Sequence, residues 1–341
     1  SRKWSKSNLD YSKMSILIYT ESENNEFKKS ALEALSYGKA LGEKMGENVT
    51  CLSINSNNFN SLKQHGADTI IDIQNQSLEK FIVKNYAEVI HQIVISESIK
   101  TIILSSSANS KYLGAYLSGK LESAYMSNVI ELPSELNPFL VKRTCYTNKA
   151  FSTTEIKSEI KIISVSSNSF GIIENVTDPD IKKIDIEIKS SDLKIKKIDK
   201  QTGAVTIADA DIVVSGGRGL KGPENWHLIE KLANLLGAAT ACSKPVSDLG
   251  WRPHSEHVGQ TGKPVASNLY IAIGISGAIQ HLAGINSSKV KVVINNDPEA
   301  PFFKAADYGI VGDAFEVVPE LIQKLEARNN NNWFLYKIKI S

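Results

Sequence analysis

Short apolar runs alternate with longer amphipathic stretches along the first third of the chain. The apolar runs predict buried strands at 15–20, 49–54, 69–73 and 101–106. The amphipathic stretches carry apolar residues at helical spacing and predict helices at 27–46, 77–96 and 110–122. Gly46 is expected to end the first helix, and Ser77 is a candidate N-cap of the second. Alternating elements of this kind favour a mainly parallel sheet with helices on both faces.

The pattern changes after Pro133 and returns after Ile207. Residues 149–167 and 181–188 are strand-rich, and the polar, lysine-rich segment 189–203 is typical of a linker. The closing part predicts strands within 210–219, 268–275, 290–296 and 308–313, and helices at 223–237, 276–284, 300–307 and 314–327. We therefore expect an α/β protein of two domains, each a mainly parallel sheet flanked by helices. Their expected bounds are 14–188 and 204–327, joined by a linker at 189–203 and flanked by tails at 1–13 and 328–341.

Composition excludes several classes of function. The 341 residues carry a formal net charge of +2, which is too small to indicate a nucleic-acid or membrane surface. No apolar run reaches the ~18 residues that a membrane span needs. Cys51, Cys145 and Cys242 are isolated in the sequence, which argues against a disulfide framework or a cysteine metal site and fits a reducing compartment. We expect no nucleic-acid partner, no membrane insertion and no metal.

A polar helix face follows one of the predicted buried strands. On a helical wheel, SGAIQHLAG (276–284) has an apolar face of Ala278, Ile279, Leu282 and Ala283 and an opposite face of Gly277, Gln280, His281 and Gly284. The apolar face is expected to pack on the domain, with Gly277 leaving open space beside His281. A helix that begins at Ser276, directly after a strand, offers free N–H groups to a phosphate. For this helix alone, a capped helix with an exposed or hydrogen-bonded histidine explains the pattern better.

Small and polar residues follow other strands of the same predicted sheet. SGGRG (215–219) sets Arg218 among glycines, and VGQTG (258–262) sets Thr261 beside another glycine. Asn295, Asn296 and Asp313 come at the ends of two further strands. A turn or a surface loop explains each motif taken singly. Because the carboxyl ends of parallel strands meet at one edge of a sheet, the motifs together predict a dinucleotide site.

The sequence contains no recognisable catalytic set. It shows no Ser–His–Asp arrangement, no H-E-x-x-H motif and no Cys/His cluster with metal spacing. The chemistry is therefore expected to belong to the ligand. A flavin gathers negative charge around N1 and the C2 carbonyl when it is reduced, and a histidine such as His281 beside that position would stabilise the reduced form.

Three segments of the chain resemble the electron transfer flavoprotein alpha subunit: VVSGGRGLKGPEN, VGQTGKPVASNLYIAIGISGAIQHLAG and INNDPEAPFFKAADYGIVGDAFEVVPELI. The likeness is close and in order from Ile207 to Leu325 and looser from Ser15 to Glu187. It implies a Rossmann-like C-terminal domain that binds FAD, and an N-terminal domain that is the base for a partner, the beta subunit, which in the family usually holds an AMP. It also implies an electron carrier rather than a substrate-converting enzyme. Electrons would come from dehydrogenases, such as acyl-CoA dehydrogenases, and leave to a quinone-linked oxidoreductase or another acceptor.

The resemblance also implies roles for residues in the matched motifs. Thr261 would lie near flavin N5, His281 near the C2 carbonyl, and Asn295 and Asp313 on the adenosine half. Lys244 departs from the pattern, because many members have an arginine there; a lysine keeps the charge but loses the planar fork, and we expect it to act as a point charge. The implied FAD-binding residues are Arg218, Ser243, Lys244, Val258, Gly259, Gln260, Thr261, Ser276, Gly277, Ala278, Ile279, Gln280, His281, Asn295, Asp313 and Ala314.

Other functions remain open at this stage. A pyridine-nucleotide-dependent oxidoreductase would need an acid/base group and a nicotinamide pocket, neither of which the sequence identifies. An electron-bifurcating flavoprotein subunit and an adenine-nucleotide-binding regulatory module are further alternatives. The expected compartment is the bacterial cytoplasm, with the mitochondrial matrix as the alternative, and the sequence does not give the electron donor or acceptor.

Overall fold

The computed structural model describes residues 15–146, 148, 150–188, 193, 195–196, 207 and 210–330, without the side chains of 329 and 330. These residues form two compact units, one that includes 15–145 and 151–188 and one that includes 210–330. The predicted tail at 1–13 and most of the predicted linker at 189–203 lie outside the described residues. Both units are α/β, with sheets flanked by helices as expected.

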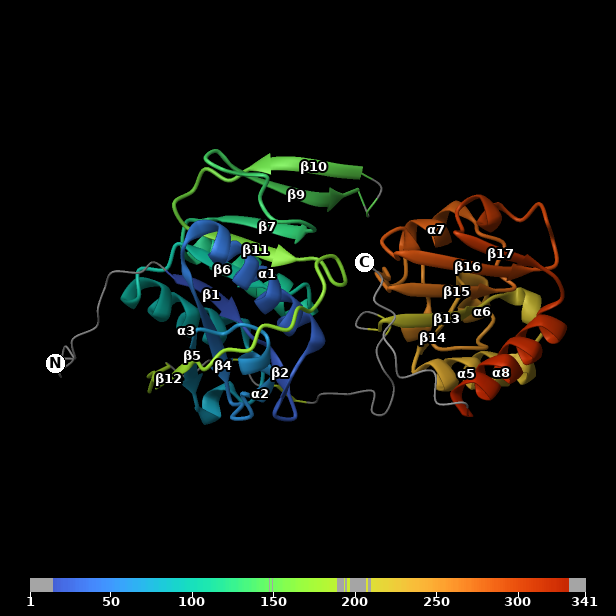
Figure 1. The fold of residues 1–341 in the computed structure, drawn as a ribbon, viewed down its shortest axis with the longest axis horizontal. Coiled ribbons are helices and arrows are strands. Elements are labelled where there is room, and N and C mark those ends of the chain that lie inside the picture. Colours follow the sequence, from blue (N-terminus) through green and yellow to red (C-terminus); the bar gives the residue numbers. More distant parts are fainter. Residues whose placement is uncertain are drawn as a thin grey trace. The chain divides into compact units, whose positions relative to one another are not determined.

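The first unit is built on one large sheet, with the strand order β10-β9-β7-β11-β6-β1-β4-β5-β12 and β8 beside β9 (Figure 1). From β7 to β12 neighbouring strands are parallel, whereas β9 is antiparallel to β7 and β8. A small antiparallel pair, β2 and β3, follows β1. The strands are β1 (Ser15–Tyr19), β2 (Ser22–Glu23), β3 (Glu26–Phe27), β4 (Asn48–Ile54), β5 (Thr69–Ile73), β6 (Thr101–Leu104), β7 (Ala124–Val129), β8 (Glu135–Leu136), β9 (Phe139–Cys145), β10 (Ala150–Glu155), β11 (Lys161–Val165) and β12 (Asp180–Lys183).

Helices cover both faces of this sheet. Ile16 and Ile18 of β1 join a core with α1, whereas Leu17 and Tyr19 join a second core with α3 and α4. Burial on both faces explains why the strands are continuous apolar runs. The helices are α1 (Lys29–Met45), α2 (Asn60–Gln64), α3 (Val83–Ser96) and α4 (Ala108–Lys120). Gly46 ends α1 in the left-handed conformation, which confirms the predicted helix stop.

The predicted helix at 77–96 is wrong at its beginning. Ser77 does not cap α3, which starts at Val83, but lies inside a short 3₁₀ turn, η1 (Gln76–Leu78). Asn75 caps that turn by accepting a hydrogen bond from the Ser77 N–H, 2.9 Å away. The Tyr86 hydroxyl donates to the Leu78 carbonyl at 2.8 Å, which ties the turn to the first part of α3.

The second unit has a parallel sheet in the order β14-β13-β15-β16-β17 (Figure 1). Its strands are β13 (Ile212–Gly216), β14 (Ala239–Cys242), β15 (Leu269–Ile273), β16 (Val290–Asn295) and β17 (Tyr308–Val311). One face packs on α5 (His227–Leu236) and α8 (Ala314–Asn330). The other face packs on α7 (Ile279–Ile285) and the 3₁₀ turn η5 (Pro301–Lys304).

Several predicted helix bounds in this unit need correction. The stretch 223–237 begins as a 3₁₀ turn, η3 (Pro223–Trp226), before α5, although Gly237 ends α5 as predicted. The helix predicted from Ser276 begins at Ile279, and the helix predicted at 300–307 is only the turn η5. The last helix, α8, continues to Asn330, beyond the predicted helix end at 327. Residues 331–341 lie outside the described part.

In each sheet there is a pair of neighbouring strands from which the chain connections lead away in opposite directions along the sheet, a topological switch point. In the first unit it lies between β1 and β6, and in the second between β13 and β15. Ligands of open α/β sheets bind outside the carboxyl ends of the strands at such a point. The loops that follow β13 and β15 are therefore the first place to look for a site in the second unit.

Candidate functional site

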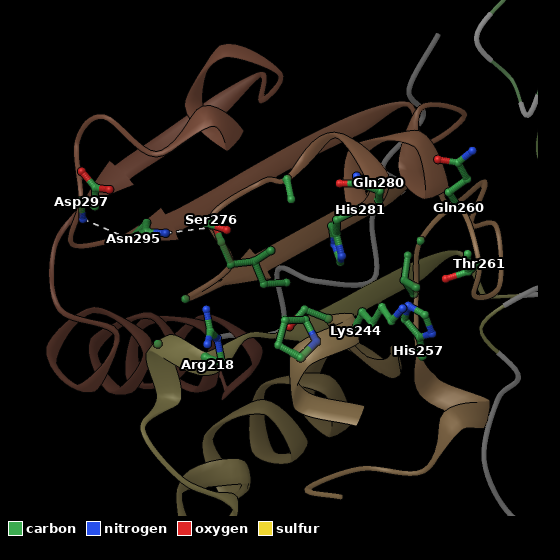
Figure 2. A pocket seen from close by; sticks show the side chains of 18 residues that line it. Arg218, Lys244, His257, Gln260, Thr261, Ser276, Gln280, His281, Asn295 and Asp297 are labelled. Atoms are coloured by element: carbon green, nitrogen blue, oxygen red, sulfur yellow. Dashed lines mark hydrogen bonds between the residues drawn. The ribbon is translucent and has the colours of Figure 1, made fainter. Parts of the chain in front are cut away.

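A cavity of about 520 Å³ opens at the carboxyl edge of the second sheet, beside the loops that follow β13 and β15. This volume is in the ordinary range for small-molecule sites. Many of the residues predicted from sequence line it: Arg218, Ser243, Lys244, Val258, Gly259, Gln260, Thr261, Ser276, Ala278, Gln280, His281 and Asn295. Figure 2 shows the labelled members coming from separate segments of the unit around one space.

Glycines let the two central loops approach each other closely. The Gly217 N–H donates to the Ile273 carbonyl at 2.9 Å, and the Gly219 N–H donates to the Gly274 carbonyl at 3.1 Å. A Cβ on Gly217 would lie 2.1 Å from the Gly274 carbonyl oxygen, and Gly274 itself has φ +63°. Side chains at these positions would separate the loops. Arg218, between two of these glycines, is exposed at the cavity.

A second wall comes from the short helix α6 (Lys244–Asp248) after β14. The Ser243 N–H donates to the Gly216 carbonyl at 3.1 Å, which attaches the beginning of α6 to the β13 loop. Lys244 is the first residue of the helix and is exposed. In Figure 2 its side chain extends beside His257. The cavity thus has two cationic side chains, Arg218 and Lys244, on different segments.

The VGQTG turn is fastened to α7 and to the end of β14. The Val258 N–H donates to the Cys242 carbonyl at 3.0 Å, and the Gln260 N–H donates to the Gln280 carbonyl at 2.7 Å. A Cβ on Gly284 would lie 2.6 Å from the Gly259 Cα, so the turn and the helix are in backbone contact. The side chains of Gln260 and Thr261 are exposed at the cavity. The turn is therefore a positioned wall and not an isolated surface loop.

The predicted faces of α7 are wrong for most of their residues, although Ala283 is buried and Gln280 is exposed as predicted. Ile279, expected to pack on the domain, has 74% of its surface exposed, whereas His281, expected on the open face, is 6% exposed. The space at Gly277 is not open, because a Cβ there would lie 2.5 Å from the Phe302 backbone nitrogen. The physical reason is the late start of the helix: residues 274–278 form a loop with Gly277 at φ +85°, and α7 then packs through His281, Ala283, Gly284 and Ile285.

His281 is a buried ring with one unused nitrogen. Its Nε2 lies 3.0 Å from the Tyr270 hydroxyl, and its Nδ1 has no hydrogen-bond partner among the described residues. Burial, reinforced by the charge of nearby His257 and opposed by the Val258 backbone, lowers the pKa of His281 to about 4. The ring is therefore neutral at pH 7. In Figure 2 it points from α7 into the cavity.

The residues predicted to hold the adenosine half divide between two places. Asn295 lines the cavity, but its amide donates to the Ile275 carbonyl at 3.0 Å and accepts from the Asp297 N–H at 3.0 Å (Figure 2). Asp313 and Ala314 do not line it. The Asp313 carboxylate accepts from the Phe315 N–H at 3.0 Å at the beginning of α8 and lies 3.7 Å from Lys221 Nζ, and Ala314 is buried in the core. Gly277 and Ile279 are also absent from the lining.

Sequence reasoning missed several residues of the cavity: Gly219, Pro245, His257, Gly274, Ile275 and Asp297. Most are direct neighbours of residues that were named, so the motif bounds were drawn too narrowly. His257 is the chemically informative one. The His257 side chain is 7% exposed, and this burial is the main cause that lowers its pKa. The negative charge of Asp248 raises the pKa, and the positive charges of Lys244 and His254 lower it. Its position directly before VGQTG was the available signal.

Within the described residues, no group of three or more histidine, cysteine, aspartate or glutamate side chains could hold a metal ion. No helix in the described part of the chain is long and apolar enough to cross a membrane.

Comparison with known proteins identifies the family. The model of the electron transfer flavoprotein domain matches residues 16–192, and that of the electron transfer flavoprotein FAD-binding domain matches residues 206–286. The alpha subunit of electron transfer flavoprotein from Thermoanaerobacterium thermosaccharolyticum is 35% identical over 91% of this chain and 97% of its own. The alpha subunit of Bacillus subtilis is 33% identical over 92% of this chain and 98% of its own length. The mitochondrial alpha subunit of Arabidopsis thaliana is 44% identical over 48% of this chain and 45% of its own length. With both domains matched and nearly its full length aligned, the chain belongs to the electron transfer flavoprotein alpha-subunit family, and its C-terminal half contains the family's FAD-binding domain.

Proposed function

We propose that the cavity at the β13–β15 edge is the FAD site and that this chain carries electrons as one subunit of a heterodimer. The observation that carries the proposal is His281. The neutral His281 ring points into a cavity at the switch point of the sheet, and its Nδ1 is buried without a hydrogen-bond partner among the described residues. A buried polar atom of this kind costs free energy unless a ligand supplies the partner.

The other walls suit an anionic, partly aromatic ligand. Arg218 and Lys244 bring positive charge, and Gln260, Thr261 and Ser276 bring exposed polar groups. Ile275, Val258 and Pro245 give apolar surface. Asn295 and Asp297 give a polar end to the cavity. Asp313 and Ala314 lie outside the lining, and their contact with the adenosine half stays a prediction. A bound flavin supplies the ability to accept and release electrons.

The chain's own residues would set how readily the site accepts negative charge. Lys244 is an exposed point charge, where a planar arginine fork would fix its partner's orientation. His281 is fixed by its burial and by Tyr270, so that its effect is directional. Gly217, Gly219 and Gly274 let the two loops beside the cavity lie in close contact. Together these groups favour a ligand that becomes more negative on reduction.

The physiological context is proposed on the family relationship. The partner would be an electron transfer flavoprotein beta subunit, the donors would be dehydrogenases such as acyl-CoA dehydrogenases, and the acceptor a quinone-linked oxidoreductase. A bacterial cytoplasmic location is proposed, with the mitochondrial matrix as the alternative. The relatives named above include two bacterial proteins and one called mitochondrial, which supports both compartments.

The test is to purify the full chain together with its co-expressed partner subunit and to record the visible absorption spectrum. Visible flavin absorption that disappears in Ser276→Trp, a variant that places a large side chain at an exposed position of the cavity lining, would support the proposal. A spectrum without flavin, after reconstitution with FAD, would reject it. The flavin count per heterodimer also separates a simple carrier, with one, from an electron-bifurcating form, with two.

A further inference from the structure

The His257 ring lies against the VGQTG turn that borders the cavity. A Cβ on Gly262 would lie 2.9 Å from Cγ and Nδ1 of this ring, and a Cβ on Gly259 would lie 3.3 Å from its Nε2. The ring therefore contacts the turn near its beginning and at its end. The Lys263 N–H donates to the His257 carbonyl at 2.9 Å, which closes the turn around the ring. Only 7% of the residue is exposed, so the protein encloses it on most sides.

The backbone that carries this ring is fixed to two other elements. His257 pairs with Cys242 at the end of β14. The preceding residue, Glu256, accepts two hydrogen bonds from Arg252, at 2.8 Å from Nε and 2.6 Å from Nη2. The same guanidinium donates to Glu230 of α5 at 3.0 Å. A planar fork paired with a carboxylate in this way fixes orientation as well as distance, so the ring is mounted on a rigid support.

The ring meets the turn by packing. Gly259 and Gly262 have no side chains, and the Gly262 N–H already donates to the Gly259 carbonyl at 3.1 Å. A second support comes from α7, because the Gln260 N–H donates to the Gln280 carbonyl at 2.7 Å. With these two supports, the side chains of Gln260 and Thr261 are exposed at the cavity. The shape of the ring, and not a hydrogen bond from it, is therefore the property that acts on the turn.

We propose that His257 is a positioning residue, whose ring packs against the VGQTG turn and holds Gln260 and Thr261 in place at the ligand. Without the ring, a gap would lie beside two glycines, which have the widest conformational freedom of all residues, and the turn would sample other conformations. Binding a ligand would then cost the free energy of ordering the turn again. This inference rests on the proposed flavin site for its consequence, whereas the state of the turn can be measured without a ligand.

Hydrogen exchange of the backbone amides in 258–263 measures the state of the turn. The full chain with its co-expressed partner subunit is compared, with bound FAD and after its removal, with His257→Ala and His257→Gln. In His257→Ala we expect exchange in this segment to become about tenfold faster and the dissociation constant of FAD to rise about tenfold. Glutamine reaches about as far as the imidazole, so we expect His257→Gln to restore both quantities to within about twofold.

His254→Ala is the matched control. His254 is an exposed histidine three residues earlier, outside the cavity lining, and its Nδ1 lies 2.8 Å from Ser247 Oγ. Its removal should leave the exchange of 258–263 and the FAD affinity unchanged. Unchanged exchange in a folded His257→Ala protein, or a turn that stays loose in His257→Gln, would overturn the proposal. If His257→Ala does not fold, nuclear Overhauser effects in the unmodified protein decide: contacts between the His257 ring protons and the α protons of Gly259 and Gly262 support the proposal, and their absence overturns it.

The two measurements separate this inference from the proposed function. If the unmodified protein binds no flavin, the proposed function fails, while exchange in the ligand-free protein still decides whether the ring holds the turn. If the turn loosens in His257→Ala and the FAD affinity stays the same, His257 supports the turn without positioning groups for the ligand, and the proposal is rejected.

Discussion

The two units have the same kind of switch point, and only one of them fills it with its own side chains. In the first unit, Glu21 follows β1 and is 4% exposed. Its carboxylate accepts hydrogen bonds from Lys28 Nζ at 2.7 Å, from the Asn109 amide at 3.0 Å and from the Ser107 hydroxyl, at the edge where β1 and β6 end. In the second unit, glycines occupy the equivalent loops, and a cavity lies beside them.

A second buried carboxylate of the first unit is also satisfied by the protein itself. Glu33 of α1 accepts backbone hydrogen bonds at 2.8–2.9 Å from Asn168, Phe170 and Gly171, in the loop that follows β11. In the second unit, by contrast, Arg218 and Lys244 are exposed at the cavity, and His281 Nδ1 has no hydrogen-bond partner in the described part. Topology therefore offers a site at each sheet, and local side chains decide whether the protein or a ligand satisfies it.

Glu33→Ala should have the largest effect, on the stability of the first unit. Three backbone N–H groups would lose their acceptor, and we expect a loss of about 4 kcal/mol in the unfolding free energy of the first unit. Urea denaturation followed by circular dichroism measures it. Glu43→Ala, on an exposed position of the same helix, is the control and should stay within about 0.5 kcal/mol of the unmodified protein. Equal effects of the two variants would contradict the assignment of Glu33 as a clamp.

Lowering the pH should reduce the stability of the second unit, because the buried His281 ring resists protonation. The folded ring has a pKa of about 4 and the unfolded ring about 6.5, so the unfolded state binds more protons between these values. Stability is then fully present above about pH 6.5 and falls as the pH drops toward 4, by about 3 kcal/mol in all. The fluorescence of Trp226, buried in this unit, can follow the unfolding. His281→Gln should lack this part of the pH dependence; identical slopes in both proteins would contradict the prediction.

Gly277→Ala tests how tightly the loop before α7 is fitted. A Cβ there meets the Phe302 backbone at 2.5–2.6 Å, whereas a Cβ at Gly237 meets nothing within 4 Å; both residues have positive φ. The two alanine variants therefore share the backbone strain but differ in the clash. We expect Gly277→Ala to cost about 2 kcal/mol more than Gly237→Ala and to lower the flavin content of the purified protein. Similar stability of the two would show that the loop can shift without loss.

Lys244→Ala should have the smallest effect. Its ammonium group is solvent-exposed and acts as a point charge, so we expect about a threefold weaker relative affinity for reduced flavin at low salt, less at high salt. Redox titration at two ionic strengths measures this. Lys289→Ala, exposed after α7 and outside the cavity lining, is the charge-matched control. No difference between the two variants would show that Lys244 does not act on the ligand.

Much of the fold could be predicted because its signals are local. Buried parallel strands are continuous apolar runs, and Gly46 and Gly237 end helices because they adopt the left-handed conformation easily. The position of the motifs at one edge of the sheet could also be predicted, because the carboxyl ends of parallel strands lie at the same edge. Helix beginnings at 77 and 276 failed because Asn75 and the Gly277 loop form local structure that competes with the first helical turn.

The order of elements, the α/β class, the sheet edge at which the candidate groups collect and, through the motifs, the family can all be read from the amino-acid sequence. Which groups face the cavity depends on tertiary packing. A helical wheel cannot show what packs against a helix, so it placed Ile279 inside and His281 outside, opposite to their observed exposure. The Tyr270–His281 hydrogen bond joins a strand to a helix across the core, and the roles of His257 and Asp313 depend on neighbours distant in sequence. Such pairings are fixed by packing, which is a property of the whole unit and not of any local pattern.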